Sequence, residues 1–565
     1  MEKKRIPIGY EDFKDIIDKN MYFVDKSLLI RQLLEEGGQT ALITRPRQFG
    51  KTLNLSMIRR FFEDERTRKG EKTDNGALFD GLAIMDCGEA VLRNQQRYPV
   101  INLSLKSGKQ SDFEMAYLSL VDEIAKEFDR HRYVLEAECL SETDQERYLL
   151  ICGRKAERIE YAKALGFLSE CLTKYHGQKT IILIDEYDVP LENAYFSGFY
   201  DEMIGFIRSL FESALKTNPY LERGVITGCL RISRESIFTG LNNLQIHSVL
   251  SPHFADSFGF TPSEVQAMLE FYGLSEKYAE LKEWYDGYLF GGAEIYNPWS
   301  IINYVSTATI APNAFPKTYW SNTSSNTIIR ELVEEADEET RKELEILMNG
   351  GIIEKPVHEE ITYGDIHTTK DNLWNFLFFT GYLKAGEQRK EGRKLFLQMS
   401  IPNEEIASIY QDSIMTWFDR KVQKTDRSPL IRALEEGDCE TAEDFLSAQL
   451  MNTISYFDYA ESYYHGFLTG LLKGAGSYEV YSNRESGTGR PDILLKTQAI
   501  RKGQVIILEL KLASSVAEMD ARCDEALQQI EDQKYAQPFL QEGYPVVKKY
   551  GLTFYKKECM VKTIQ

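Results

Sequence analysis

A continuous apolar run at residues 179–184 (KTIILI) constrains the fold more than any other segment of this 565-residue chain. An uninterrupted run rich in β-branched residues is typical of a strand buried on both faces, as in a parallel sheet covered by helices. Helical stretches separate this run from three further candidate strands, at 40–44, 98–103 and 223–228. The alternation of strands and helices predicts a parallel α/β domain.

The remainder of the chain shows two further patterns. Residues 260–450 are mostly helical in pattern and include aromatic-rich segments. The last 115 residues again combine candidate helices and strands, at 457–473, 478–482, 491–496, 504–512, 515–536, 545–555 and 558–564. We therefore predict an α/β protein of three parts: an α/β domain at 1–258, a helical region at 259–450 and a small α/β domain at 451–565.

A candidate phosphate-binding loop follows the first strand. Residues 45–52 (RPRQFGKT) lie between this strand and a helical stretch, and their last three residues match the end of the motif G-x-x-x-x-G-K-[ST]. Gly50 would let the backbone approach phosphate oxygens, Lys51 would neutralise the β- and γ-phosphates, and the Thr52 hydroxyl would bind Mg²⁺. This context predicts an ATP-binding site.

Several arginines could add to this site. Arg45 occupies the position of the first glycine of the motif, where a side chain could alter the turn. Arg45 and Arg47 could also add positive charge near the phosphates, and Arg47 is included among the expected nucleotide-binding residues. After the fourth strand, Arg231 and Arg234 could reach a γ-phosphate or could be surface residues.

The run at 179–184 ends in two carboxylates, Asp185 and Glu186. An aspartate at the carboxyl end of such a strand can hold Mg²⁺, and a following glutamate can act as general base on the attacking water. Asp188 is interpreted as a turn residue. The alternative is a buried strand that ends in an acidic turn without any catalytic role.

A second set of charged residues lies in the C-terminal part, where Asp492 opens one candidate strand and the next carries Glu509 and Lys511. Residues i and i+2 of a strand point to the same face, so Glu509 and Lys511 should project together. The carboxylates of Asp492 and Glu509 would form an oxygen-ligand site for Mg²⁺ or Mn²⁺. With a lysine to orient water or stabilise charge, this set suits metal-assisted phosphodiester hydrolysis.

Neighbouring helices supply further candidates for this second site. Glu461 and His465 are spaced i, i+4 and share a helix face, so Glu461 could be another metal ligand, whereas His465 is either a site residue or a packed helix residue. Gln529 and Tyr535 could support the lysine or contact a nucleic-acid backbone. The alternative is an exposed hairpin with an ordinary salt bridge, although unpaired charge on apolar strands is costly.

Charge is distributed unevenly along the chain, whose formal net charge is −20. This total excludes a generally basic nucleic-acid binder. Residues 1–60 carry 12 basic and 8 acidic residues, and residues 451–565 carry 14 of each, so the excess acid lies between them. Local contact with a phosphate backbone is compatible with this distribution, whereas tight non-specific coating of DNA is not.

The cysteines and the apolar segments indicate the compartment. The eight cysteines are scattered and never form a C-x-x-C pair, which is typical of reduced thiols and not of a disulfide framework or a zinc ribbon. No apolar run reaches the length of a membrane helix, and no apolar segment follows the basic residues near the start. We therefore expect a cytoplasmic protein without a membrane partner.

The last 115 residues resemble the PD-(D/E)XK nuclease superfamily. The residues that carry this resemblance are Pro491, Asp492, Glu509, Leu510, Lys511, Glu461, Gln529, Tyr535 and the loop 483–490. The resemblance implies a restriction-endonuclease-like α/β fold and metal-dependent cleavage of nucleic acid, with DNA favoured over RNA.

The first 250 or so residues resemble AAA-ATPase-like P-loop proteins of gut bacteria and their relatives. The matching segments are 22–26 (YFVDK), 44–52 (TRPRQFGKT) and 184–188 (IDEYD). In that family the Arg-Pro-Arg form of the loop is usual, so Arg45 is expected to be a family variant. The resemblance implies a bacterial P-loop NTPase domain with a parallel sheet, and its pairing with a nuclease domain is typical of these proteins.

Two functions remain open from the sequence. The first is an ATP-binding, ATP-hydrolysing protein with a metal-dependent nuclease domain, using ATP and Mg²⁺, with Mn²⁺ as an alternative at the nuclease site. The second is a nucleotide-switched module that binds nucleic acid or protein without turnover. Homo-oligomerisation is left open.

Overall fold

The computed structural model describes residues 3–564 apart from residues 217, 232–237, 239–242, 321–328, 330–331, 333–336, 358, 360–368, 425, 452–460, 474–477 and 483–488. Within described helices, it leaves out the side chains of residues 370, 415–424, 451 and 461–463. The chain divides into two compact units, one formed by residues 1–325 with 352–409 and the other by residues 326–351 with 410–565. The predicted boundaries after residues 258 and 450 stay predictions.

A parallel sheet forms the centre of the first unit. Within the described residues it has five strands in the order β2-β3-β4-β1-β5. Their bounds are β1 (Thr40–Thr44), β2 (Val100–Ser104), β3 (Thr180–Asp185), β4 (Leu221–Gly228) and β5 (Leu244–His247). The predicted parallel α/β sheet is confirmed, and β3 is buried along its whole length, as its apolar run indicated. The short edge strand β5 has no such run and was not predicted.

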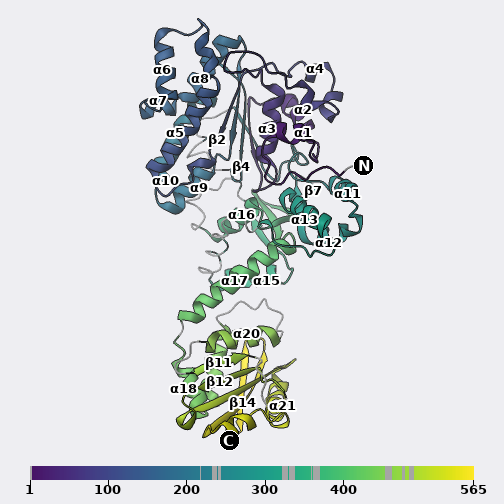
Figure 1. Ribbon diagram of the computed structural model, residues 1–565, viewed down its shortest axis with the longest axis vertical. Helices are drawn as coiled ribbons and strands as arrows, with labels where there is room; N and C mark the ends of the chain where they lie inside the picture. The colour runs from purple at the N-terminus through teal and green to yellow at the C-terminus, as the bar shows by residue number, and fades with distance from the viewer. Residues whose placement is uncertain are drawn as a thin grey trace. The chain divides into compact units, whose positions relative to one another are not determined.

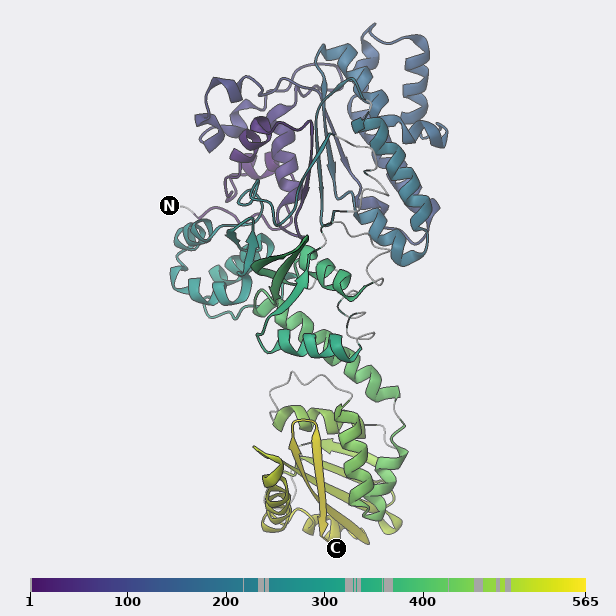
Figure 2. The ribbon, with the colours of Figure 1, turned by 180° about the vertical axis from the view of Figure 1, so that it is seen from behind.

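Helices cover both faces of this sheet (Figures 1 and 2). One face carries α1 (Phe13–Asp18), α2 (Leu28–Glu35), α3 (Lys51–Phe62) and α4 (Glu89–Leu92). The other carries α5 (Phe113–Arg130), α6 (Glu142–Cys152), α7 (Arg158–Ala162), α8 (Ala164–His176), α9 (Val189–Ser197) and α10 (Tyr200–Phe211). Apolar side chains of α1, α2 and α3 pack with Ile43, Ile181 and Val225 of the strands in one buried core.

The middle of the chain adds helices and two small antiparallel sheets to the first unit. The helices are α11 (Pro262–Tyr272), α12 (Tyr278–Tyr285), α13 (Pro298–Ile310) and α16 (Lys370–Thr380). The strands are β6 (Tyr288–Phe290) with β7 (Ala293–Ile295), and β8 (Ile353–Pro356), β9 (Lys384–Glu391) and β10 (Lys394–Ser400), the last three in the order β8-β10-β9. The helical character is confirmed. The sequence patterns did not predict the sheet of β8, β10 and β9, because β9 (KAGEQRKE) is solvent-exposed and shows no alternation of apolar and polar residues.

The second unit is built on a mixed sheet in the order β11-β12-β13-β14-β15, in which β13 and β14 are parallel and the other neighbours are antiparallel. The strands are β11 (Tyr478–Ser482), β12 (Ile493–Thr497), β13 (Gln504–Leu512), β14 (Val546–Tyr555) and β15 (Glu558–Ile564). The helices are α15 (Glu338–Met348), α18 (Ser428–Glu436), α19 (Cys439–Met451), α20 (Glu461–Leu472), α21 (Met519–Asp532) and α22 (Gln537–Glu542). The predicted small α/β domain is confirmed. Helix α17 (Glu404–Lys424) begins in the first unit and ends in the second.

Candidate active sites

The predicted phosphate loop connects β1 to α3. Gly50 precedes the first residue of α3 and has φ +81°, a left-handed conformation that glycine adopts without steric cost. The Lys51 ammonium donates hydrogen bonds to the carbonyl oxygens of Arg45 and Pro46, each at 2.8 Å, and lies 3.6 Å from the Cys229 sulfur. The lysine therefore lies across its own loop, at the place where phosphate oxygens would take over these contacts.

The predicted magnesium ligands meet at the carboxyl edge of the sheet. Thr52 at the start of α3 donates a hydrogen bond of 2.6 Å from its hydroxyl to Oδ2 of Asp185 at the end of β3. The hydroxyl of Thr227, on β4, donates to the other oxygen, Oδ1. Asp185 is only 5% exposed. A hydroxyl and a carboxylate brought together in this way fit the hard oxygen donors that Mg²⁺ prefers.

Glu186 follows Asp185 in a left-handed backbone conformation, with φ +50°. Non-glycine residues rarely adopt this conformation, and it often marks a functional position. Burial, together with the neighbouring Asp185, raises the pKa of Glu186, although Lys51 and Lys106 partly offset this. A carboxylate with a raised pKa is a better proton acceptor for water.

The two loop arginines differ in their surroundings. Arg45 is completely buried, and its guanidinium donates to the carbonyl oxygens of His247 and Ser248 at 3.0 Å, and to that of Phe254 at 3.0 Å. It does not line the pocket, and burial lowers its pKa to about 9. Arg47 does line the pocket and forms an ion pair with Glu192 of α9.

The other charged candidates near this loop have separate partners. The Asp188 carboxylate accepts hydrogen bonds from the amides of Cys229 at 2.7 Å and Leu230 at 3.1 Å, so it holds the segment that follows β4. Arg231 lies 3.8 Å from the carboxylate of Glu359. Arg234 lies outside the described residues.

A pocket of about 540 Å³ opens beside the phosphate loop. Lys51, Thr52 and Glu186 line its polar end, together with two lysines that the sequence patterns did not single out, Lys106 and Lys109. These lysines follow β2, at the same sheet edge as the ends of β1 and β3, and this position was the signal available in the sequence. Lys106 donates a hydrogen bond of 3.1 Å to Glu11, another lining residue.

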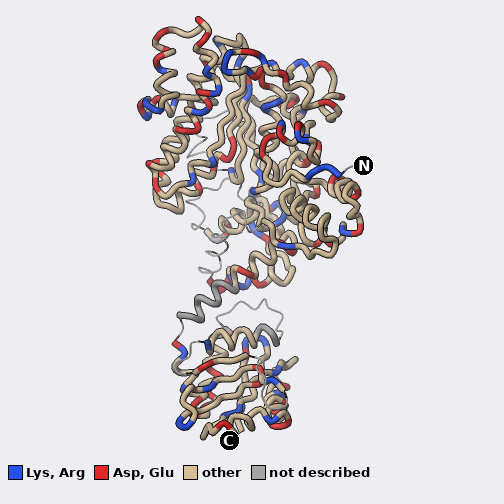
Figure 3. The backbone as a smooth tube through the Cα atoms, in the orientation of Figure 1, with Lys and Arg blue, Asp and Glu red and all other residues tan. Residues whose placement is uncertain are grey.

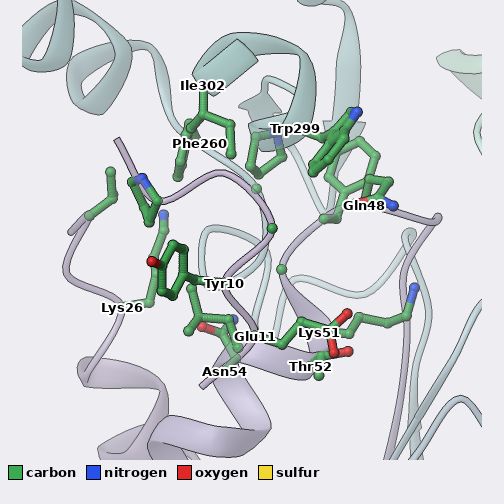
Figure 4. A pocket seen from close by; sticks show the side chains of 18 of the residues that line it. Tyr10, Glu11, Lys26, Gln48, Lys51, Thr52, Asn54, Phe260, Trp299 and Ile302 are labelled. Atoms are coloured by element: carbon green, nitrogen blue, oxygen red, sulfur yellow. The ribbon is translucent and has the colours of Figure 1, made fainter. Parts of the chain in front are cut away.

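The opposite end of the pocket is apolar and aromatic. Figure 4 shows Phe260, Trp299 and Ile302 on the side opposite Lys51 and Thr52. Further apolar lining comes from the N-terminal segment before β1, including residues 6–7 and 22–24. A pocket with cationic groups at one end and aromatic rings at the other matches the two ends of a nucleotide.

The C-terminal candidates converge on one side of the second unit's sheet. The Lys511 ammonium lies 3.9 Å from Oε1 of Glu509, so the two side chains of β13 project together, as their spacing predicted. Oδ2 of Asp492, just before β12, accepts a hydrogen bond of 2.8 Å from the amide of Leu510. The Asp492 amide in turn lies 3.4 Å from Oε2 of Glu509. Adjacent oxygen donors from two strands fit a Mg²⁺ or Mn²⁺ site.

Gln529 of α21 joins the lysine to the buried glutamate. Its side-chain NH₂ donates to Oε1 of Glu509, and its carbonyl oxygen accepts a hydrogen bond of 2.7 Å from Lys511. Glu509 is only 2% exposed. The Tyr535 hydroxyl donates to the carbonyl oxygen of Arg490 at 3.2 Å, so this tyrosine supports the segment that leads to Asp492.

His465 of α20 lies beside this site. Its Nε2 is 2.9 Å from the carbonyl oxygen of Asp492 and 3.0 Å from the Ser482 hydroxyl. The side chain of Glu461 and the loop 483–488 lie outside the described residues. Among the described side chains, no three of His, Cys, Asp or Glu gather closely enough to hold a metal, so the second site has two described carboxylates, Asp492 and Glu509.

Two family models match the chain, and each match contains one of the two candidate sites. Residues 7–238 match the model described as "Predicted AAA-ATPase", and residues 459–564 match that of the PD-(D/E)XK nuclease superfamily. The chain joins an AAA-ATPase-like domain to a PD-(D/E)XK domain. It is also 25% identical over 561 residues to a protein of Azotobacter chroococcum mcd 1 described as "Uncharacterized protein in vnfD 5'region", covering 97% of this chain and 96% of that protein.

The part of the chain that the structure describes contains no candidate for a membrane-spanning helix. None of the helices there combines the length and the apolar character that crossing a bilayer requires.

Proposed function

We propose that the AAA-ATPase-like domain binds and hydrolyses ATP and that the PD-(D/E)XK domain cleaves nucleic-acid phosphodiester bonds, with DNA as the substrate. The observation that carries the first half is the hydrogen bond between Thr52 and Asp185, residues 133 positions apart, at the polar end of the pocket. The second half rests on the cluster of Asp492, Glu509 and Lys511, joined by Gln529.

ATP binding follows from the two ends of the pocket. The triphosphate would lie along the N-terminus of α3, where backbone amides and the Lys51 ammonium attract anions. Lys106 and Lys109 add positive charge at the same end. The adenine ring would contact Phe260 and Trp299, because aromatic side chains stack on planar bases without strict geometry.

Hydrolysis needs a proton acceptor beside the terminal phosphate. Glu186 lines the polar end of the pocket, and its raised pKa suits removal of a proton from water. Thr52 and Asp185 would hold Mg²⁺, which when bound neutralises charge on the phosphates. Thr227 keeps the Asp185 carboxylate in position through its hydroxyl.

Phosphodiester cleavage would use the second cluster. Asp492 and Glu509 would hold Mg²⁺ or Mn²⁺, which when bound acts as a Lewis acid on a phosphoryl oxygen. Lys511 would orient water or stabilise negative charge on the phosphate, and Gln529 fixes the position of its ammonium. The strand pair brings these groups to one point, as metal-assisted hydrolysis requires.

The first readout of the test is ATP binding and turnover by the full-length chain with Mg²⁺. Lys51→Ala should abolish tight binding, whereas Glu186→Gln should keep binding and lower turnover by about 10²–10⁴-fold. Lys69→Ala removes an exposed lysine and serves as the matched control. Binding without turnover in the wild type would instead favour a nucleotide-switched binding module.

The second readout is cleavage of double-stranded DNA, single-stranded DNA and RNA with Mg²⁺ or Mn²⁺. Asp492→Asn and Lys511→Ala should abolish cleavage, whereas Asp532→Asn, at an exposed position of α21, should leave it intact. Cleavage that survives in both site variants would show that the assigned cluster is not the active site. Preferential cleavage of RNA would contradict the proposed substrate.

A further inference from the structure

A buried carboxylate lies in the first turn of α17, the helix that begins in the first unit and ends in the second. Glu405 is only 1% exposed, whereas its neighbour Glu404 is exposed. Ile409 is the last residue of the helix that belongs to the first unit, and Tyr410 is the first that belongs to the second. Any movement of the first turn therefore acts on an element that both units share.

One oxygen of Glu405 is tied to a wall of the nucleotide pocket. The Ser300 hydroxyl, on α13, donates a hydrogen bond of 2.7 Å to Oε2 of Glu405. Ser300 is completely buried, and its helix neighbours Trp299 and Ile302 line the apolar end of the pocket. Figure 4 shows both of these side chains at the pocket. The position of α13 and that of the first turn of α17 are therefore linked.

The other oxygen is tied to the phosphate loop through a tryptophan. The backbone amide of Trp320 donates a hydrogen bond of 2.8 Å to Oε1 of Glu405. The indole Nε1 of the same residue lies 3.3 Å from the carbonyl oxygen of Arg47, in the loop. Trp320 is 1% exposed and packs on Tyr382, with ring centroids 4.9 Å apart. The loop and α17 are thus joined through one rigid side chain.

The same region packs tightly on the loop at a second point. A Cβ on Gly381, which has φ +93°, would lie 2.9 Å from Cβ of Pro46. Close packing of this kind leaves little room for the loop to move without displacing its neighbours. Glu405 therefore accepts one hydrogen bond from α13, which contributes Trp299 and Ile302 to the pocket, and one from Trp320, whose indole contacts the phosphate loop.

The burial of the Glu405 carboxyl group indicates that its hydrogen bonds stabilise it. Burial raises the pKa of Glu405 to about 7, against the lowering effect of the Ser300 hydroxyl and the amides of Trp320 and Tyr319. A buried carboxyl group is costly unless it is hydrogen-bonded, and an apolar residue would fill the same space at lower cost. We therefore attribute the carboxyl group at this position to the two segments that it links, α13 and the segment of Trp320.

We propose that nucleotide occupancy of the pocket is transmitted to α17 through Glu405, so that the AAA-ATPase-like domain regulates the PD-(D/E)XK domain. This inference rests on the proposed ATP binding. A ligand that changes the spacing between the phosphate loop and α13 would strain either the bond from Ser300 or the connection through Trp320, because both end on the Glu405 carboxyl group. The first turn of α17 then moves together with the segment whose hydrogen bond to Glu405 remains intact.

The experiment compares full-length wild type with Glu405→Gln, which keeps the side-chain shape but replaces one acceptor oxygen by a donor. Ser300→Ala removes the bond to α13 alone, and Glu404→Gln is the control with the same change at an exposed site. A non-hydrolysable ATP analogue with Mg²⁺ is the probe. Its affinity is measured first, followed by hydrogen exchange across residues 404–424 and by nucleic-acid cleavage.

We expect the analogue to bind all four chains, and to bind Glu405→Gln and Ser300→Ala at least as tightly as wild type and Glu404→Gln, because these two variants have no bond to strain. In wild type and Glu404→Gln it should increase the exchange protection of the first turns of α17 and change the cleavage rate by at least about fivefold, the lower end of typical allosteric coupling. In Glu405→Gln and Ser300→Ala both effects should disappear, while cleavage without nucleotide stays at the wild-type rate.

Normal binding of the analogue with no response in wild-type α17 would overturn the inference and leave the proposed ATP site standing. A response that persists in Glu405→Gln and Ser300→Ala would also overturn it, as would wild-type cleavage that is identical with and without analogue. Failure of the analogue to bind would overturn the ATP site and the inference together, and the affinity measurement identifies that case. If no cleavage occurs, the nuclease function is wrong and hydrogen exchange alone decides the Glu405 link.

Discussion

At the scale of single residues, a buried charge network fixes the far end of the helix that follows the phosphate loop. Glu63 directly follows α3 and is 1% exposed. Its carboxylate accepts a hydrogen bond of 2.7 Å from Nε of Arg59 and forms an ion pair with Arg130 of α5. Burial alone would raise the pKa of Glu63, but Arg130 and Arg59 outweigh it and lower this pKa to about 2.

Replacing Glu63 by Gln should lower the free energy of unfolding by about 3 kcal/mol at pH 7, because Arg130 loses a buried partner. The pKa in the folded protein lies below the ordinary value of 4.5. The difference in unfolding free energy between wild type and Glu63→Gln is therefore complete above pH 4.5 and is lost as the pH falls towards 2. Urea unfolding at several pH values, followed by circular dichroism, measures the difference.

Glu114→Gln, at an exposed position of α5, is the control for this substitution and should change stability by less than about 0.5 kcal/mol. A Glu63→Gln deficit that stays constant from pH 7 to pH 3 would contradict the assignment of the network.

At the scale of elements, two helices outside the matched nuclease segment complete the PD-(D/E)XK domain. The Tyr550 hydroxyl of β14 donates a hydrogen bond of 2.6 Å to the carbonyl oxygen of Leu434 in α18. The amide of Cys559 in β15 donates to the Ser447 hydroxyl of α19 at 3.1 Å. Both helices precede residue 459, where the family match begins. Helices α18 and α19 therefore cover groups of β14 and β15 that would otherwise be exposed to water.

We therefore expect a fragment of residues 426–565 to fold and a fragment of residues 459–565 to remain largely unfolded. The shorter fragment exposes the edge of β15 and leaves the Tyr550 hydroxyl without its partner in α18. Thermal melting followed by circular dichroism, with the dispersion of amide NMR signals, distinguishes the two outcomes. Cooperative melting of both fragments at the same temperature would show that α18 and α19 are dispensable.

At the scale of the whole molecule, the chain consists of two compact units that carry different chemistry. The nucleotide pocket is lined entirely by residues of the first unit, and the Asp492–Lys511 cluster belongs to the second. Positions of acidic and of basic residues alternate along the backbone of both units (Figure 3), although the formal net charge of the chain is −20. Local contact with a nucleic-acid backbone is compatible with this charge distribution along the chain.

Calorimetry of the full-length chain should therefore show two unfolding transitions, because proteins of several domains commonly depart from two-state behaviour. ATP with Mg²⁺ should stabilise mainly the first unit, by about 2.7 kcal/mol at a concentration a hundred times the Kd. Lys51→Ala should abolish this shift while leaving the other transition in place. A single transition would contradict independent unfolding of the two units, and an equal ligand shift of two transitions would contradict the assignment of the nucleotide to one unit.

Local residue patterns were sufficient to predict several elements and one pair of site residues. The run at 179–184 became the buried strand β3, because a continuous apolar stretch fits only a site that is covered on both faces. The two-residue period of a strand placed Glu509 beside Lys511. The family resemblances at the two ends of the chain agree with the family-model matches.

Contacts between segments that are distant in the chain became visible only in the folded molecule. Folding brought Thr52 to Asp185 and directed Arg45 to the carbonyl oxygens of His247, at the end of β5, and of Ser248. It also buried Glu405 between α13 and the Trp320 amide. The physical reason is that the direction and charge state of a side chain depend on neighbours that fold against it, and no local periodicity records these neighbours.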